Sequence, residues 1–266
     1  MAETPPNLRA DAFAGAAEDY LRYRPPYPVA LVASLVGATD SGPDPKAIDL
    51  GCGPGRLTFA LAPSFGEVWG VDLEPEMVAL ARAEAARRGL ANIRFSLGRA
   101  ENLEAPTGAF ALVAAAEAFH RLDQPFMLAA AMRWLAPGGL FASIGGQNFL
   151  EGAAPWRRRL ADVAAGWIAA AAAPAPAHED FVARQRRQFA EAGLTDFTVR
   201  EFDVEHEWTV ESLLGFLRST SVLSRHALGD RHAAFETAVR AALLAADPSG
   251  RYRETLRFGY TVGRKP

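Results

Sequence analysis

The residues of this chain best suited to chemistry are two carboxylates and three glycines. They lie in and between two successive apolar runs. Asp49 lies in the short apolar run 47–50, glycines follow at 51, 53 and 55, and Asp72 ends the next apolar run. Glycine permits positive φ and has no Cβ, so a ligand can lie directly against the backbone of such a turn. A helix that begins there points unpaired N–H groups at the same ligand.

The position of Asp72 suits it to bind a sugar. It lies 72 − 49 = 23 positions after Asp49, so the two strand ends are neighbours in a parallel sheet. A carboxylate at that place can accept hydrogen bonds from both hydroxyls of a ribose. Dinucleotide sites prefer the spacing G-x-G-x-x-G, and here Arg56 stands at the last of those positions. The spacing therefore disfavours a dinucleotide-dependent oxidoreductase, which we keep as an alternative.

This segment resembles the first motif of the class I S-adenosylmethionine-dependent methyltransferases, an acidic residue followed by x-G-x-G-x-G. Three further segments occur in the order of that family: G-x-A-E-x-L at 98–103, a segment at 117–123, and L-x-P-G-G at 135–139. The resemblance implies S-adenosylmethionine as cofactor and S-adenosylhomocysteine as product. It also implies that the cofactor is bound by Asp49, Gly51, Cys52, Gly53, Gly55, Asp72, Leu73, Met77, Ala100, Glu101 and Glu117.

Residues 117–123 resemble the Q-A-L-H-W-F-D segment of a subgroup that includes trans-aconitate methyltransferase. The resemblance places Glu117 near the cofactor amine. His120 is the candidate base, because its usual pKa suits proton transfer near neutrality, and a packing role beside the cofactor is the alternative. This chain has Arg121 and Leu122 where relatives have tryptophan and phenylalanine, so the acceptor of those relatives cannot be transferred to it.

Residues 20–28 resemble the Y-x-x-x-R-P-x-Y-P segment of the same subgroup. The resemblance implies that Tyr20 and Arg24 bind the cofactor, since a guanidinium can hold a carboxylate by two parallel hydrogen bonds. A proline-stiffened surface linker with a solvated arginine is the alternative. The residues that we expect to contact the methyl acceptor are Tyr27, Phe119, Arg121, Trp156, Trp208 and Ser219.

The implied reaction is methylation of an oxygen, a carbon or a carboxylate of a small molecule. Alignment of donor and acceptor is the main demand on the enzyme, because the sulfonium methyl group is already activated and its leaving group is neutral. A methyltransferase-like protein that binds the cofactor without transferring the methyl group is a second alternative.

Alternating apolar runs and helical patterns up to about residue 146 predict a parallel sheet that positions these residues. We expect strands at 47–50, 68–72, 92–97 and 109–116, and helices at 28–37 and from Pro75 to a stop at Gly89. Residues 197–205 and 254–263 alternate like strands, with helices at 209–219 and 232–246 between them. The fold class is α/β, a Rossmann-like seven-stranded class I methyltransferase sheet, mostly parallel with an antiparallel last strand.

We expect a single methyltransferase domain, 1–266, with four parts. These are an N-terminal segment with a helix at 1–44, a cofactor-binding core at 45–146, a helical lid insert at 147–192, and a C-terminal part with the final strands at 193–266. The insert is alanine-rich and would cover the carboxyl edge of the sheet, where ligands of open α/β sheets bind. Its arginine clusters at 157–159 and 184–187 are expected to face solvent.

The composition argues against several partners. Twenty-eight basic and 31 acidic side chains give a formal charge of −3, so the chain lacks the excess of basic residues that is typical of proteins that bind nucleic acid. The single Cys52 excludes an internal disulfide and is expected to pack rather than react, and no metal site is predicted. Residues 1–6 carry no signal region, and the apolar stretch 163–173 is too short to span a membrane, so we expect a cytoplasmic protein. The oligomeric state, monomer or homodimer, is not determined by the sequence.

Overall fold

The computed structural model describes residues 11–39, 42–146, 152, 154–168 and 178–266. The chain divides into two compact units. The first unit contains residues 1–26, 147–174 and 203–256, and the second contains 27–146, 175–202 and 257–266. Parts of the expected insert, at 147–151, 153 and 169–177, and the expectation for residues 1–6 lie outside the described residues.

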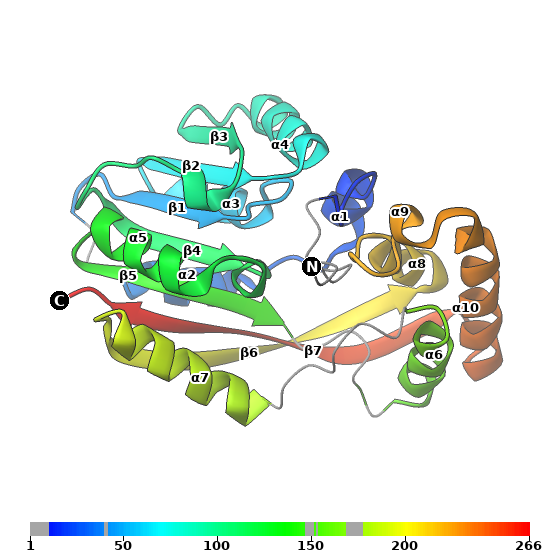
Figure 1. Ribbon diagram of the computed structural model, residues 1–266. Coiled ribbons are helices and arrows are strands. Elements are labelled where there is room, and N and C mark those ends of the chain that lie inside the picture. Colours follow the sequence, from blue (N-terminus) through cyan, green and yellow to red (C-terminus); the bar gives the residue numbers. More distant parts are fainter. Residues whose placement is uncertain (1–10, 40–41, 147–151, 153, 169–177) are drawn as a thin grey trace, which may run out of the picture. The chain divides into compact units, whose positions relative to one another are not determined.

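A seven-stranded sheet is the central element of the described structure, with the strand order β3-β2-β1-β4-β5-β7-β6 (Figure 1). The neighbouring pairs among the first five strands are parallel, and β7 is antiparallel to β5. The expected fold class is thereby confirmed. The strands are β1 (Lys46–Leu50), β2 (Glu67–Asp72), β3 (Ile93–Leu97), β4 (Phe110–Ala116), β5 (Leu135–Gly146), β6 (Thr195–Thr209) and β7 (Arg251–Arg264).

Strands β6 and β7 are longer than the sequence predicts. In the additional residues, charged side chains occupy the exposed positions beside the buried Trp208 and Tyr252. Glu207 forms ion pairs there with Arg251 and Arg253, the latter at 2.9 Å. Cross-strand pairs of opposite charge support a ladder that an apolar pattern does not reveal.

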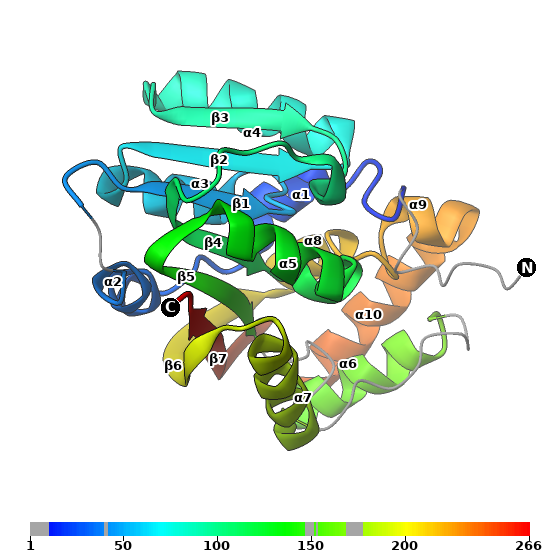
Figure 2. The same cartoon turned by 60° about the vertical axis from the view of Figure 1, so that its left-hand side comes forward.

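Apolar side chains cover both faces of the sheet in the second unit. Leu31 and Leu35 of α2 (Val29–Gly37) and Leu57 and Leu61 of α3 (Arg56–Leu61) lie in one buried cluster. The other cluster contains buried side chains of α5 (Gln124–Trp134) and Phe189 of α7 (His178–Glu191). Figure 2 shows helices α5 and α7. The buried residues on both faces explain why β4 is apolar throughout rather than alternating.

The helix ends follow the signals in the sequence. Helix α4 (Pro75–Arg88) begins with proline in its first turn and ends at Gly89, whose φ of 67° is in the left-handed region. Helix α8 (Val210–Arg218) begins with a capping box, in which Thr209 and Ser212 bond reciprocally. Helix α10 (His232–Ala246) spans the expected residues.

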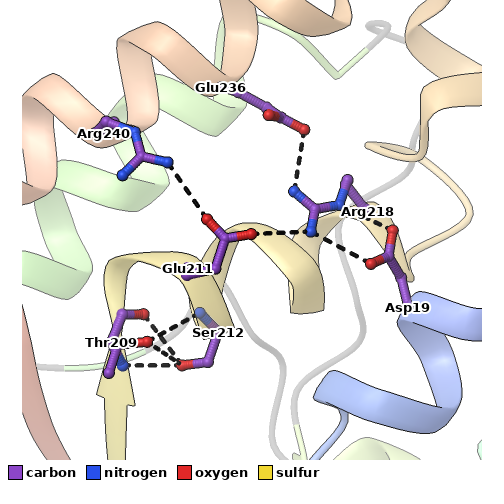
Figure 3. A network of polar contacts seen from close by, with 7 residues as sticks. All are labelled: Asp19, Thr209, Glu211, Ser212, Arg218, Glu236 and Arg240. Carbon is purple, nitrogen blue, oxygen red and sulfur yellow. Dashed lines mark hydrogen bonds and ion pairs between the residues drawn. The ribbon is translucent and has the colours of Figure 1, made fainter.

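In the first unit, one arginine joins three helices. Arg218 of α8 bonds to Asp19 of α1 (Ala17–Tyr23) at 2.8 Å and to Glu236 of α10 at 3.2 Å (Figure 3). Glu211 of α8 also contacts Arg218, at 3.4 Å, and pairs with Arg240 of α10 at the same distance. The short helix α1, which the sequence analysis did not predict, is therefore tied to α8 by charge.

The helices of the expected insert fall in different units: α6 (Pro155–Ala165) belongs to the first and α7 to the second. Gln185 of α7 is buried and bonds to Ser143 of β5 and Thr261 of β7, so α7 is a core helix of the second unit. Arg157 is also buried rather than solvated, because it forms an ion pair with Glu254. None of the described helices is long and apolar enough to cross a membrane.

Candidate functional site

The glycine turn between β1 and α3 bends as the sequence analysis expects. Gly51, Gly53 and Gly55 have φ values of 65°, 53° and 87°, all in the region that favours glycine. A Cβ on Gly51 would lie 2.6 Å from the Cβ of Ala118, which follows β4. The turn therefore packs tightly against the chain that leaves β4, and a side chain at position 51 has no room.

Asp72 is bonded to the glycine turn. Its Oδ2 accepts a hydrogen bond from the backbone N–H of Gly53 at 2.8 Å, and its Oδ1 accepts one from the N–H of Glu74 at 2.9 Å. Burial is the largest effect on this carboxyl and raises its pKa, opposed by these two backbone donors and by the charge of Arg121. Each carboxylate oxygen has two lone pairs, so both can still accept from the hydroxyls of a ribose.

Asp49 is fully buried inside β1. Its Oδ2 accepts a hydrogen bond from the hydroxyl of Thr58 at 2.7 Å, whereas its Oδ1 has no hydrogen-bond partner among the described residues. Burial raises the pKa of Asp49 to about 7, despite the opposing hydrogen bond from Thr58. An unpaired buried carboxylate oxygen beside a glycine turn fits a ligand with a positively charged amino group.

Cys52 packs within this turn. Its side chain is buried, and burial raises the pKa of the thiol well above its usual value. A cysteine held in the thiol form is a poor nucleophile. The packing role expected from the sequence agrees with this geometry.

The resemblance assigns four further residues to the cofactor, and they follow the carboxyl ends of β2 and β3: Leu73, Met77, Ala100 and Glu101. Ala100 and Met77 are buried, and the side chain of Leu73 is 38% exposed. Glu101 accepts a hydrogen bond from the backbone N–H of Asp123 at 3.2 Å and pairs with Arg99 at 3.5 Å. Arg99 is thus the ionic partner of Glu101.

The segment after β4 forms a short turn. Glu117 has a φ of 55°, and its Oε1 accepts a hydrogen bond from the backbone N–H of Gly146 at 2.6 Å. The single helical turn Phe119–Arg121 follows, with Phe119 buried and His120 exposed. Arg121 lies close enough to Asp72 for its charge to lower the pKa of that carboxyl. This turn therefore lies near the candidate site.

Tyr27 also belongs to the second unit. Its ring packs edge-on against Phe258, at 6.2 Å between centroids, and the guanidinium of Arg56 lies 5.1 Å from its ring centroid. Arg56 is the first residue of α3, directly after the glycine turn. Tyr27 is thereby placed next to the helix that the turn begins.

The other predicted residues lie in the first unit. Arg24 donates through Nε to the hydroxyl of Ser219 at 3.1 Å and through Nη2 to its backbone oxygen at 3.2 Å. The same guanidinium lies 4.1 Å from the ring centroid of Tyr20. Trp208 donates to Glu254, and Trp156 packs on Tyr252 at 5.2 Å between ring centroids. Both tryptophans are buried, so in this unit they are core residues.

The sequence analysis did not predict three residues that contact the candidate site. Thr58, Ala118 and Gly146 contact Asp49, Gly51 and Glu117, respectively. The only available signal was the small size of Ala118 and Gly146, which is common in this alanine-rich chain. Among the described residues, no group of three or more histidine, cysteine or acidic side chains could hold a metal ion.

The fold and the site define a class of protein. A sheet of this order, with a glycine turn after β1 and an acid at the end of β2, has the Rossmann-like arrangement in which nucleotide cofactors are commonly bound. Residues 47–139 match the family model described as the methyltransferase domain. This segment of the chain is therefore similar to a methyltransferase domain, as the glycine motif predicts.

Curated relatives match only over part of their length. An uncharacterized methyltransferase of Bacillus subtilis, YcgJ, is 35% identical over 78 residues, 29% of this chain and 31% of that protein. The nocamycin O-methyltransferase of Saccharothrix syringae is 34% identical over 109 residues, 40% of this chain and 39% of that protein. The 23S rRNA (uracil(1939)-C(5))-methyltransferase RlmD of Aeromonas hydrophila is 38% identical over 77 residues, 29% of this chain and 18% of that protein. The chain thus spans well under half of each of these relatives.

The solved structure of YcgJ has a similar fold. It superposes with a TM-score of 0.57 at 17% identity, covering 89% of this chain and 98% of that chain. The sequence relatives include an enzyme that acts on RNA, so they do not confirm the expected exclusion of nucleic acid. The trans-aconitate subgroup also stays a prediction.

Proposed function

We propose that this chain transfers the methyl group of S-adenosylmethionine to a small-molecule acceptor. One observation carries the proposal: the carboxylate of Asp72 accepts from Gly53 N–H, which joins the end of β2 to a turn of three left-handed glycines. Such a turn places no Cβ atom between its backbone and the aminoacyl part of a cofactor, and the carboxylate retains lone pairs for a ribose. The unpaired Oδ1 of Asp49 supports the same placement.

The residues of the second unit have separate roles in this proposal. Asp72 holds the ribose hydroxyls, while the glycine turn lies against the aminoacyl part. Ala100 and Leu73 provide apolar contacts for the adenine ring of the cofactor, and Glu101 provides a hydrogen-bond acceptor for it. When bound, the cofactor supplies an activated methyl group with a neutral leaving group.

His120 is the proposed base. It is exposed, and it lies on the helical turn directly after β4, three residues beyond Glu117. An exposed imidazole can take a proton from an acceptor hydroxyl or acidic carbon and pass it to water. A carboxylate acceptor needs no base, and Arg121 would then serve as its positive partner. The roles of Tyr20, Arg24, Trp156, Trp208 and Ser219 stay predictions, since only their contacts within the first unit are described.

A small molecule is favoured over RNA by charge. The full chain carries a formal charge of −3, and proteins that bind polyanions depend on an excess of lysine and arginine. The nocamycin O-methyltransferase shows that a relative with a matching segment acts as an O-methyltransferase. We extend that reaction type, not its substrate, to this chain.

Calorimetric titration tests the proposal. We expect saturable binding of S-adenosylhomocysteine and none of NAD or NADP; binding of a dinucleotide alone would contradict it. Release of S-adenosylhomocysteine is then followed with a panel of hydroxyl, carboxylate and acidic-carbon acceptors and with RNA. Turnover with RNA alone would replace the small-molecule proposal, and binding without turnover on any acceptor would favour a protein that does not transfer the methyl group.

A further inference from the structure

Glu117 has an unusual backbone conformation at the end of β4. Its φ is 55°, and among the described residues only Asp196 is another non-glycine residue with positive φ. This left-handed region is costly for a residue with a Cβ and persists where neighbouring contacts hold it. The side chain of Glu117 is half-buried, so these contacts can be identified.

Both the backbone and the side chain of Glu117 are bonded to β5. Its backbone N–H donates to the carbonyl oxygen of Ile144 at 2.8 Å. Its Oε1 accepts from the backbone N–H of Gly146 at 2.6 Å. A hydrogen bond from an amide to a carboxylate is shorter and stronger than one between neutral groups, so the carboxylate is a firm attachment.

The conformation of Glu117 decides where the next residues go. Ala118 follows it and packs so closely on Gly51 that a Cβ there would lie 2.6 Å from the Cβ of Ala118. The helical turn that carries His120 begins one residue later. The direction of the chain at Glu117 therefore sets both the packing of the glycine turn and the position of the proposed base.

We propose that Glu117 is a positioning residue of this site, and that its carboxylate acts on Gly146 rather than on the cofactor amine. By accepting from Gly146 N–H, the carboxylate holds residue 117 in the left-handed conformation. That conformation presses Ala118 against Gly51 and presents His120 beyond the end of β4. The inference rests on the proposed function and replaces the ligand role expected for Glu117 from the sequence.

Two conservative variants separate the two roles. Glu117→Gln keeps an oxygen at the same reach but removes the negative charge. Glu117→Asp keeps the charge but is one methylene too short to reach Gly146 N–H. We expect Glu117→Gln to bind S-adenosylhomocysteine within about threefold of the parent, and Glu117→Asp to lose about tenfold, corresponding to one lost hydrogen bond to a charged group.

Amide exchange gives a readout that does not depend on catalysis. The Gly146 amide, followed by nitrogen-15 NMR, should stay protected in Glu117→Gln and exchange faster in Glu117→Asp. Glu67 supplies the control. It is a partly buried carboxylate at the start of β2, the end away from Asp72, and it is paired with Lys46 at 3.1 Å. Glu67→Gln and Glu67→Asp should leave both binding and Gly146 exchange at the values of the parent.

The outcomes decide between the alternatives. Weak binding by Glu117→Gln together with parental binding by Glu117→Asp would overturn the proposal, since the charge would then contact the cofactor directly. Equal losses in both variants, or no loss in either, would overturn it as well. A parent that binds no S-adenosylhomocysteine would contradict the proposed function instead, and Gly146 exchange would still test the attachment.

Discussion

The carboxylate of Asp72 accepts a hydrogen bond from the backbone N–H of Gly53 at 2.8 Å, so the acid that ends β2 holds the turn that follows β1. The same side chain accepts from Glu74 N–H at the start of α4. Asp72 is therefore placed to organise two backbone segments at once. A change at Asp72 should therefore disturb both segments.

Asp72→Asn should weaken binding of S-adenosylhomocysteine by at least tenfold. The amide retains one acceptor oxygen, so its NH₂ group must face one of the two backbone N–H donors. Losing a hydrogen bond to a charged group costs about 1.5–3 kcal/mol. Titration calorimetry measures the loss, with Asp196→Asn, an exposed carboxylate of the same unit, as the control. Parental affinity in Asp72→Asn would refute this role.

Asp49 makes the stability of the protein depend on pH. Its pKa of about 7 lies above its usual value of 3.8, so the folded protein holds this proton more tightly than the unfolded chain. This carboxyl therefore makes the free energy of unfolding decrease as the pH rises from about 4 to about 7, and the deficit persists above that range.

Asp49→Asn removes this penalty. We expect the variant and the parent to melt at similar temperatures near pH 4, and the variant to be more stable at pH 8 by on the order of 2–4 kcal/mol. Thermal unfolding at several pH values measures the difference. A difference that does not change with pH would contradict the assignment.

His120→Gln should lower kcat and spare cofactor binding. A positioned general base contributes roughly 10²–10⁴-fold, so we expect a drop of about a hundredfold with an acceptor that must lose a proton. The half-buried His232, at the start of α10, provides the control variant His232→Gln, which should match the parent. Unchanged turnover in His120→Gln would leave His120 only a packing role.

Arg218→Met should destabilise the first unit. The substitution leaves Asp19, Glu211 and Glu236 close together without the cation that they share. Removing one partner of a buried pair costs up to about 3–5 kcal/mol, and the partial exposure of these carboxylates reduces that value. Arg240→Met is the matched control: its pair with Glu211 is exposed, so the cost should stay below about 1 kcal/mol. Denaturant unfolding compares the two variants.

Local patterns were sufficient to predict the elements around the site. Strand β1, the glycine turn and the stop of α4 at Gly89 depend on apolar runs and on φ values that only glycine adopts readily, and such signals lie within a few residues of one another. The resemblance of the glycine motif likewise predicted the methyltransferase domain. Helix α1 was missed because it is short and is held by Arg218, 199 positions from Asp19.

The sequence by itself predicted strands β1 to β4, the glycine bend after β1 and the resemblance to methyltransferases, because each depends on residue types at short spacing. Only the tertiary structure decided that Asp72 bonds to Gly53, that Oδ1 of Asp49 is unpaired, and that the carboxylate of Glu117 turns to Gly146. Hydrogen-bond partners and burial depend on which segments the fold brings together. A carboxylate in a sequence does not show whether its partner will be a backbone amide, a cation or a ligand.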